Sequence, residues 1–233
     1  MLLSTPGLVL HTTPYAETSV VAKVFTRQLG LRSYIIKNVR GPRGKVKQNL
    51  LQPLSDIDMV VYDNPKTDLN YIKELFPRHP LATTDYLLPV RNALRFFMTE
   101  VLYKALHEAE PMPNLFDYVE AVNAQAAFSD AQLPIFFLLS VARYLGIEPL
   151  DNYNSCEPLF DLQEGRFVSV PAETTLSPRH SLLLHQYLTV TDFPIPAFAD
   201  RRVLIDALIT YYQLHLSGFH NFHSHEILHA ILK

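Results

Sequence analysis

The spacing of apolar residues changes once along this chain, near residue 80. Before that point, apolar and aromatic residues occur in short runs separated by proline and glycine, a pattern typical of β-strands. Beyond it, from Leu87 to Ala105, apolar residues recur every three or four positions, which is typical of an amphipathic helix. The sequence therefore predicts a β-rich domain over residues 1–80 and an α-helical domain over residues 81–233.

Six short runs in the first part predict strands, at residues 8–10, 20–26, 31–39, 49–54, 57–62 and 69–75. Five or six strands in so short a length favour a small antiparallel β-barrel of the OB type. The fold class expected for the whole chain is α+β with two domains, the barrel preceding the helices.

The second part predicts helices near residues 83–105, 114–127, 133–145, 177–188, 200–216 and 223–232. Thr83 or Thr84 is available as the N-cap of the first of these. Residues 152–170 interrupt the helical pattern, and their two short apolar runs around Glu164-Gly165 predict a small β insertion.

Several common functions are excluded by composition and motifs. A single cysteine, Cys156, rules out an intrachain disulfide framework and a four-cysteine zinc site. The glycine-rich dinucleotide and P-loop motifs and G-x-S-x-G are all absent. No apolar run has the length of a spanning helix and no export signal is visible, so we expect a cytoplasmic protein without a cofactor.

Charge is distributed very unevenly. Residues 18–55 contain no acidic residue, and the net charge of the whole chain is −3. The eight basic residues of this window are Lys23, Arg27, Arg32, Lys37, Arg40, Arg43, Lys45 and Lys47. The window therefore carries +8 and the remainder −11, which predicts a surface that attracts a polyanion. The alternative is a solvated basic face without a ligand.

Side-chain alternation combines these cations with aromatic rings. If residues 20–27 and the segment that begins at residue 31 are strands, Lys23, Phe25 and Arg27 lie on one face of the first strand. Arg32, Tyr34 and Arg40 then lie on one face of the second. Cations suit phosphates and rings suit stacked bases, although Phe25 and Tyr34 would equally well fill the barrel core. The segment 40–47 adds four more cations between glycine and proline residues.

Two further patterns have competing interpretations. His225-Glu226-x-x-His229 matches the H-E-x-x-H motif of zinc peptidases. Only four residues follow it, so a third ligand would have to come from His220 or His223. The favoured alternative is a terminal amphipathic helix in which Ile227, Leu228 and Ile231 pack.

Five aromatic residues lie at core-like spacing, so we expect them to be packed inside rather than to form a ligand site: Tyr71, Phe76, Phe96, Phe97 and Phe136.

Several short motifs follow one another along the whole chain. They are G-L-V-L-H at 7–11, Y-A-E-T-S at 15–19, Phe25-Thr26 before Gly30, K-N-V-R-G at 37–41, L-Q-P-L at 51–54, Y-L-G at 144–146 and the Tyr211-Tyr212 segment. In their order and spacing they resemble the bacterial RecO family of recombinational DNA-repair proteins. The resemblance covers essentially the whole chain, and it implies an OB-fold followed by a helical domain.

The resemblance also implies a non-enzymatic role. Such proteins bind single- and double-stranded DNA, anneal complementary strands, and work with RecR and RecF to load RecA onto DNA coated by single-strand-binding protein. The DNA-contacting candidates it implies are the eight basic residues, and the alternation of side chains along the strands adds Tyr34. Arg91, Arg95 and Arg143 are candidates for holding the acidic tail of single-strand-binding protein. The alternatives are the zinc peptidase and a generic OB-fold RNA-binding module.

One departure from the family concerns the β insertion. Many RecO-like chains carry a four-cysteine zinc module there, whereas this chain retains only Cys156. We therefore expect no metal, and we expect Leu159, Phe160, Leu162 and Phe167 to hold the insertion together by packing.

Overall fold

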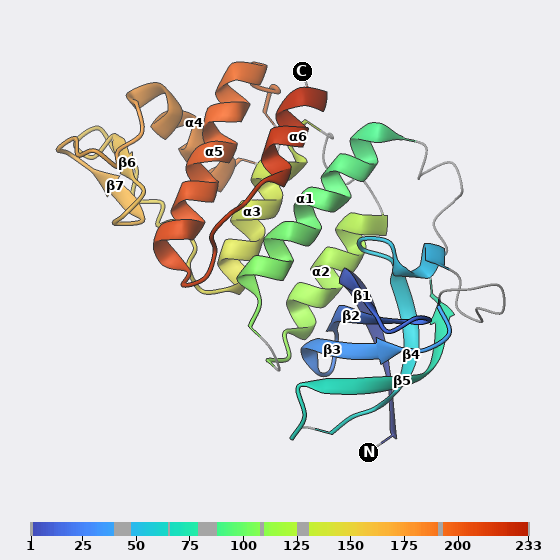
Figure 1. Ribbon diagram of the computed structural model, residues 1–233. Helices are drawn as coiled ribbons and strands as arrows, with labels where there is room; N and C mark the ends of the chain where they lie inside the picture. The colour runs from blue at the N-terminus through green and yellow to red at the C-terminus, as the bar shows by residue number, and fades with distance from the viewer. Residues whose placement is uncertain are drawn as a thin grey trace. The chain divides into compact units, whose positions relative to one another are not determined.

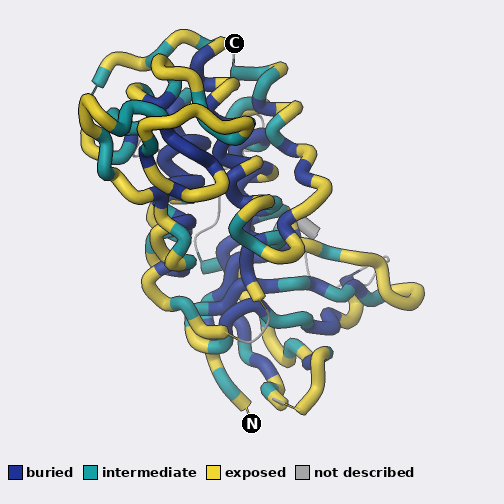
Figure 2. The backbone as a smooth tube through the Cα atoms, turned by 90° about the vertical axis from the view of Figure 1, so that its left-hand side faces the viewer, coloured by how far each residue is buried: buried dark blue, intermediate teal, exposed yellow. Residues whose placement is uncertain are grey.

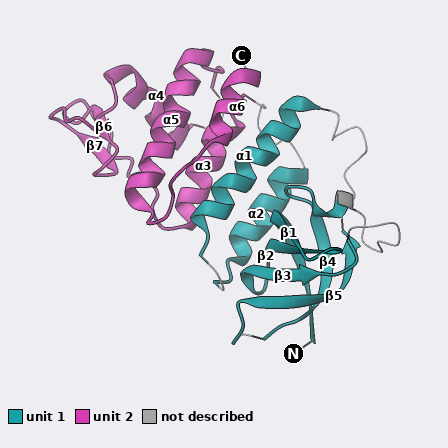
Figure 3. Cartoon of the chain, viewed as in Figure 1, with its two compact units in different colours: residues 1–127 teal, residues 128–233 magenta. Residues whose placement is uncertain are grey.

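The computed structural model describes residues 2–39, 48–64, 66–78, 88–107, 110–124, 131–190 and 193–232. The chain divides into two compact units, residues 1–127 and 128–233 (Figure 3). The change from strands to helices near residue 80 thus lies inside the first unit, which contains the β-barrel and the first two helices.

The first unit is built on a closed five-stranded barrel (Figure 1). Its strands are β1 (Leu2–Tyr15), β2 (Ser19–Thr26), β3 (Gly30–Ile36), β4 (Asp56–Tyr62) and β5 (Leu69–Pro77), in the order β1-β2-β3-β5-β4. The pair β3–β5 is parallel and the other pairs are antiparallel. The expected OB-like barrel is confirmed.

The predicted strand at 49–54 is wrong. Gln48–Leu51 forms a short 3-10 helix, η1, instead. Pro53 cannot donate to a strand ladder, and Leu54 has a φ of 55°, which no strand residue adopts. Leu54 is nevertheless fully buried, so the apolar run that suggested a strand reflects packing on the core.

Alternate residues of the strands fill the barrel interior, and buried segments run along the barrel strands in Figure 2. The inward-facing residues are Val20, Ala22 and Val24 on β2, Tyr34 and Ile36 on β3, and Ile57, Met59 and Val61 on β4. A register shift between Val9 and His11 lets β1 pair with β4 along its first half and with β2 along its second half.

Two helices complete the first unit, α1 (Pro89–Ala105) and α2 (Pro113–Ala124). α1 begins with Pro89 and has no side-chain cap, whereas the expected caps Thr83 and Thr84 lie outside the described residues. Phe116 of α2 packs on Phe25 of β2, with 5.6 Å between the ring centroids, and both rings are fully buried. α2 therefore covers part of the outer face of the barrel.

The second unit is helical, with α3 (Leu133–Tyr144), α4 (Pro178–Thr189), α5 (Phe198–His215) and α6 (Ser224–Ile231). α3 is apolar nearly all round and lies at the centre of the unit. The buried Tyr212 of α5 donates a hydrogen bond of 2.7 Å to the carbonyl oxygen of Leu138. Ser177 caps α4 by accepting a hydrogen bond from the backbone N–H of His180. Within the described residues, no helix combines the length and the apolarity needed to span a bilayer.

The predicted β insertion is confirmed as a two-stranded sheet of β6 (Leu159–Asp161) and β7 (Arg166–Val168). Phe160 and Phe167 are fully buried and meet edge to face at 5.0 Å. The side chain of Asn152 binds both the N–H and the carbonyl oxygen of Phe167. Packing and amide hydrogen bonds hold the insertion, as expected, and Cys156 is exposed.

Candidate nucleic-acid interface

Two of the candidate cations, Lys23 on β2 and Arg27 directly after it, contact the helices of their own unit. The ammonium of Lys23 lies 5.3 Å from the ring centroid of Tyr103 on α1. Arg27 makes a two-pronged ion pair with Asp117 of α2, with Nε–Oδ1 and Nη2–Oδ2 distances of 2.7 and 2.9 Å. The hydrogen bond from Arg27 lowers the pKa of Asp117. The positive charge of Arg27 is therefore already offset inside the first unit.

The interpretation of Tyr34 as a DNA-contacting residue is wrong. Its ring is fully buried in the barrel core, between the inward-facing residues of β2 and β4. Burial raises the pKa of its hydroxyl. Phe25 is also buried, against α2. Neither ring can stack on a base in this fold, because a base needs an exposed face.

The remaining basic candidates differ in exposure. Arg32 on β3 is half-buried and its Nε is enclosed. Lys37 follows β3 directly and is exposed, with its ammonium 5.0 Å from the ring centroid of Tyr71. Four further cations, Arg40, Arg43, Lys45 and Lys47, lie outside the described residues. Lys37 is thus exposed, whereas the Arg27 side chain, which is 42% exposed, is paired with Asp117.

Three of the aromatic residues expected in the core are on the surface instead. Tyr71 and Phe76 of β5 and Phe96 of α1 are each about half exposed, so the prediction for them is wrong. The prediction is confirmed for Phe97 and Phe136, which are buried. The pairing of β5 with β4 shifts between Ile72 and Glu74, so Ile72 and Leu75 both pack on the barrel core although they are three residues apart. Strict alternation along β5 therefore does not show that Tyr71 and Phe76 both face water.

The three arginines proposed for an acidic tail do not form one described site. Arg95 is buried in the first unit, where its Nε donates to Asn123 Oδ1 at 3.4 Å. Arg143 belongs to the second unit, and it is exposed and bound to Glu148 at 2.7 Å. Arg91 lies in the first unit and is half-buried. The burial of Arg95 contradicts a role in binding an acidic tail, because the guanidinium is not offered to solvent.

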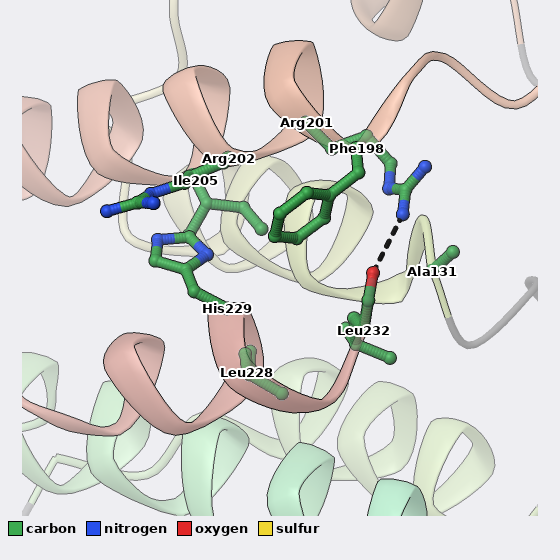
Figure 4. A pocket seen from close by; sticks show the side chains of 8 residues that line it. All are labelled: Ala131, Phe198, Arg201, Arg202, Ile205, Leu228, His229 and Leu232. Carbon is green, nitrogen blue, oxygen red and sulfur yellow. Dashed lines mark hydrogen bonds between the residues drawn. The ribbon is translucent and has the colours of Figure 1, made fainter.

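The H-E-x-x-H motif lies on α6 of the second unit. His229 is bound through Nε2 to Asp206 Oδ1 of α5 at 2.7 Å, and its ring meets that of His225 at 5.6 Å. Figure 4 shows His229 beside Arg202 and Ile205 in a small pocket between α5 and α6. In the part of the chain that the structure describes, no three His, Cys, Asp or Glu side chains are placed to hold a metal.

The packing expected of this terminal helix is partly wrong. Leu228 is buried, whereas Ile227 is about half exposed. The helix is tied to α5 by polar groups as well, because Nη2 of the buried Arg201 donates to the carbonyl oxygen of Leu232 at 3.0 Å (Figure 4).

We expect the protein to contain no stoichiometric zinc after dialysis against metal-free buffer. The reason is that a zinc site needs at least three protein ligands, and no three His, Cys, Asp or Glu side chains of the described residues are placed to hold a metal. His229 is instead hydrogen-bonded to Asp206. Atomic emission spectroscopy measures the metal content. Stoichiometric zinc that disappears in a His225→Ala/His229→Ala double variant would contradict this expectation.

Comparisons with known proteins cover both parts of the chain. The family model described as "Recombination protein O N terminal" matches residues 1–80, and the one described as "Recombination protein O C terminal" matches residues 89–224. The chain is 33% identical to DNA repair protein RecO of Phocaeicola vulgatus and 32% identical to that of Porphyromonas gingivalis, over 94% of both chains in each case. It is 29% identical to DNA repair protein RecO of Flavobacterium johnsoniae over 99% of both chains. These matches show that the chain belongs to the RecO family of DNA repair proteins.

Proposed function

We propose that this protein is a non-enzymatic, cytoplasmic mediator of DNA repair. In this role it binds single- and double-stranded DNA, anneals complementary strands and, with RecR and in some reactions RecF, helps to load RecA onto DNA coated by single-strand-binding protein. The observation that carries the proposal is that the chain matches both the N-terminal and the C-terminal model of one family of DNA repair proteins.

We place the DNA-contacting surface at the end of β3. Lys37 is exposed there, and the chain continues into the segment that contains Arg40, Arg43, Lys45 and Lys47. Arg27 contributes less in this proposal because its charge is paired with Asp117, and Lys23 contributes less because it is half-buried. Arg32 also contributes less, because it is half-buried and its Nε is enclosed.

Electrostatics explains how such a surface would promote annealing. Two complementary strands repel each other through their phosphates, and cations that neutralise phosphates release counterions and reduce that repulsion. Contacts with the backbone carry no sequence information. A mediator of this kind therefore accepts any pair of strands and leaves the selection to base pairing.

The partners are part of the same proposal. Arg91 and Arg143 remain candidates for the acidic tail of single-strand-binding protein, each on its own unit, whereas Arg95 is excluded by its burial. A labelled peptide of that tail, titrated against the Arg91→Ala and Arg143→Ala variants separately, tests which unit carries the site.

Replacing Arg40, Arg43, Lys45 and Lys47 together by alanine is expected to weaken DNA binding strongly and to flatten its salt dependence. Each phosphate contact contributes about 0.7 to the slope of log K against log salt for single strands and about 0.9 for duplexes. Loss of four contacts therefore reduces the magnitude of the slope by about 2.8 for single strands and about 3.6 for duplexes. Fluorescence polarisation with labelled single-stranded and duplex oligonucleotides over a salt series measures both quantities.

A matched control removes the same charge elsewhere. Arg143, Arg166, Arg179 and Arg202 are exposed in the second unit, and their joint replacement by alanine changes the net charge equally. Equal binding by the wild type and the first variant would refute the placement of the site. Failure of the wild type to anneal complementary DNA oligonucleotides, together with tight binding of RNA, would favour the RNA-binding module instead.

A further inference from the structure

Three exposed side chains lie side by side on the neighbouring strands β1, β4 and β5 of the barrel. Leu2 pairs with Tyr62, and Tyr62 pairs in turn with Tyr71. Directly paired residues on neighbouring strands point to the same face of a sheet. Leu2, Tyr62 and Tyr71 are 49%, 52% and 45% exposed. We call these three residues the apolar row.

The row lies on the outside of the barrel. Met59 and Val61 of β4 fill the barrel core, so the next residue, Tyr62, points outward. Tyr71 also pairs with Ile35 of β3, which is buried. The two adjacent tyrosines expose about half of their surface side by side, and contiguous exposed apolar groups are a feature of binding sites.

Charge indicates which kind of ligand fits. Lys37 lies two residues beyond Ile35, and its ammonium is 5.0 Å from the ring centroid of Tyr71. It belongs to the acid-free window, which continues into four more cations at residues 40–47. The turn between β4 and β5 carries Asp63 and the exposed residues Lys66 and Asp68, a net charge of −1. The cation that contacts a ring of the row is Lys37, and its ammonium group favours an anionic ligand at Tyr71.

We propose that Tyr62 and Tyr71 form a stacking platform for unpaired bases of a single nucleic-acid strand, with Lys37 on the adjoining phosphate. The inference rests on the proposed DNA-binding function and adds to it the residues that distinguish single strands from duplexes. Unpaired bases offer their faces to aromatic side chains, whereas bases in a duplex are already stacked on each other. The Cα atoms of directly paired residues on neighbouring strands are about 5 Å apart. Two tyrosine rings at this spacing can stack on one base or on two successive bases.

The experiment compares Tyr62→Ala, Tyr71→Ala and their double variant with the wild type. The probes are a labelled single-stranded oligonucleotide containing 2-aminopurine and a duplex of the same length. Phe76→Ala is the matched control, because Phe76 is an equally exposed aromatic residue of the same strand outside the row. The Tyr62→Phe/Tyr71→Phe variant keeps both rings and removes only the hydroxyl groups.

Each alanine replacement is expected to weaken single-strand binding about tenfold, and the double variant about a hundredfold. Duplex binding should change by less than about twofold, and the phenylalanine variant and the Phe76→Ala control should bind both probes as the wild type does. Quenching of 2-aminopurine fluorescence, which reports stacking, should disappear in the double variant. Circular dichroism and thermal unfolding confirm that each variant is folded.

Other outcomes overturn the inference in recognisable ways. A wild type that binds neither probe refutes the proposed function itself. If the wild type binds both probes and the double variant binds the single strand equally well, the DNA-binding function stands and the stacking platform does not. Equal losses on single strand and duplex also contradict stacking. If the wild type self-associates in sedimentation experiments and the double variant does not, with DNA binding unchanged, the row is an interface between copies.

Discussion

Phe116→Ala is expected to destabilise the first unit by about 3–5 kcal/mol, the range for removing a fully buried aromatic side chain. The ring is completely enclosed and packs on Phe25, which is itself completely buried on the outer side of β2. Truncation would leave a cavity between the helix and the barrel. Urea denaturation followed by circular dichroism measures the change in the free energy of unfolding.

Hydrogen exchange adds a test that is specific to this contact. If α2 stabilises β2, the amides of β2 should exchange faster in the Phe116→Ala variant, because local opening then costs less. Phe96→Ala on α1 serves as the control, since that ring is half exposed and its loss should cost under about 1 kcal/mol. Similar costs for the two variants would contradict the packing of α2 on the barrel.

Gly30→Ala is expected to cost about 2–5 kcal/mol, from two sources that add. Gly30 begins β3 with a φ of +69°, a conformation that is unfavourable for any residue with a Cβ atom. A Cβ atom there would also collide with the carbonyl oxygen of Glu110 and would lie 2.8 Å from its backbone nitrogen. Backbone atoms cannot swing aside as a side-chain tip can, so the segment at Glu110 would have to move.

Gly146→Ala separates the two sources. Gly146 has a φ of +73°, and nothing lies within 4 Å of the position that a Cβ atom would take there. This substitution therefore carries only the conformational cost of about 1–2 kcal/mol. Chemical denaturation of both variants, compared with the wild type, gives the difference. Equal costs at Gly30 and Gly146 would show that the close approach of Glu110 does not constrain the first unit.

The architecture was largely predictable because it follows from periodicity. The change in apolar spacing near residue 80 separated strands from helices, and α3 was recognisable as a central helix because it is apolar nearly all round. The strand expected at 49–54 failed because an apolar run fits any buried backbone, and only Pro53 argued against a ladder there. Alternation also could not say which rings face water, since both faces of β2 are buried, one by the core and one by α2.

The candidate site was less predictable than the fold, because it depends on partners distant in sequence. The excess of cations was visible in residues 18–55, but Asp117, which pairs with Arg27, lies 90 residues further along. Tyr103 is similarly remote from Lys23. Local patterns report what a strand carries, whereas only tertiary packing decides which of its charges stay available to a ligand.

Because α2 covers the outer face of β2, it limits where this protein can be cut into stable fragments. A fragment cut near residue 80, where strands give way to helices, would strip Phe25 of its cover and Arg27 of its counter-ion. Bare aromatic surface of this kind promotes aggregation. The shortest piece that keeps the outside of the barrel intact therefore runs through the end of α2 at Ala124.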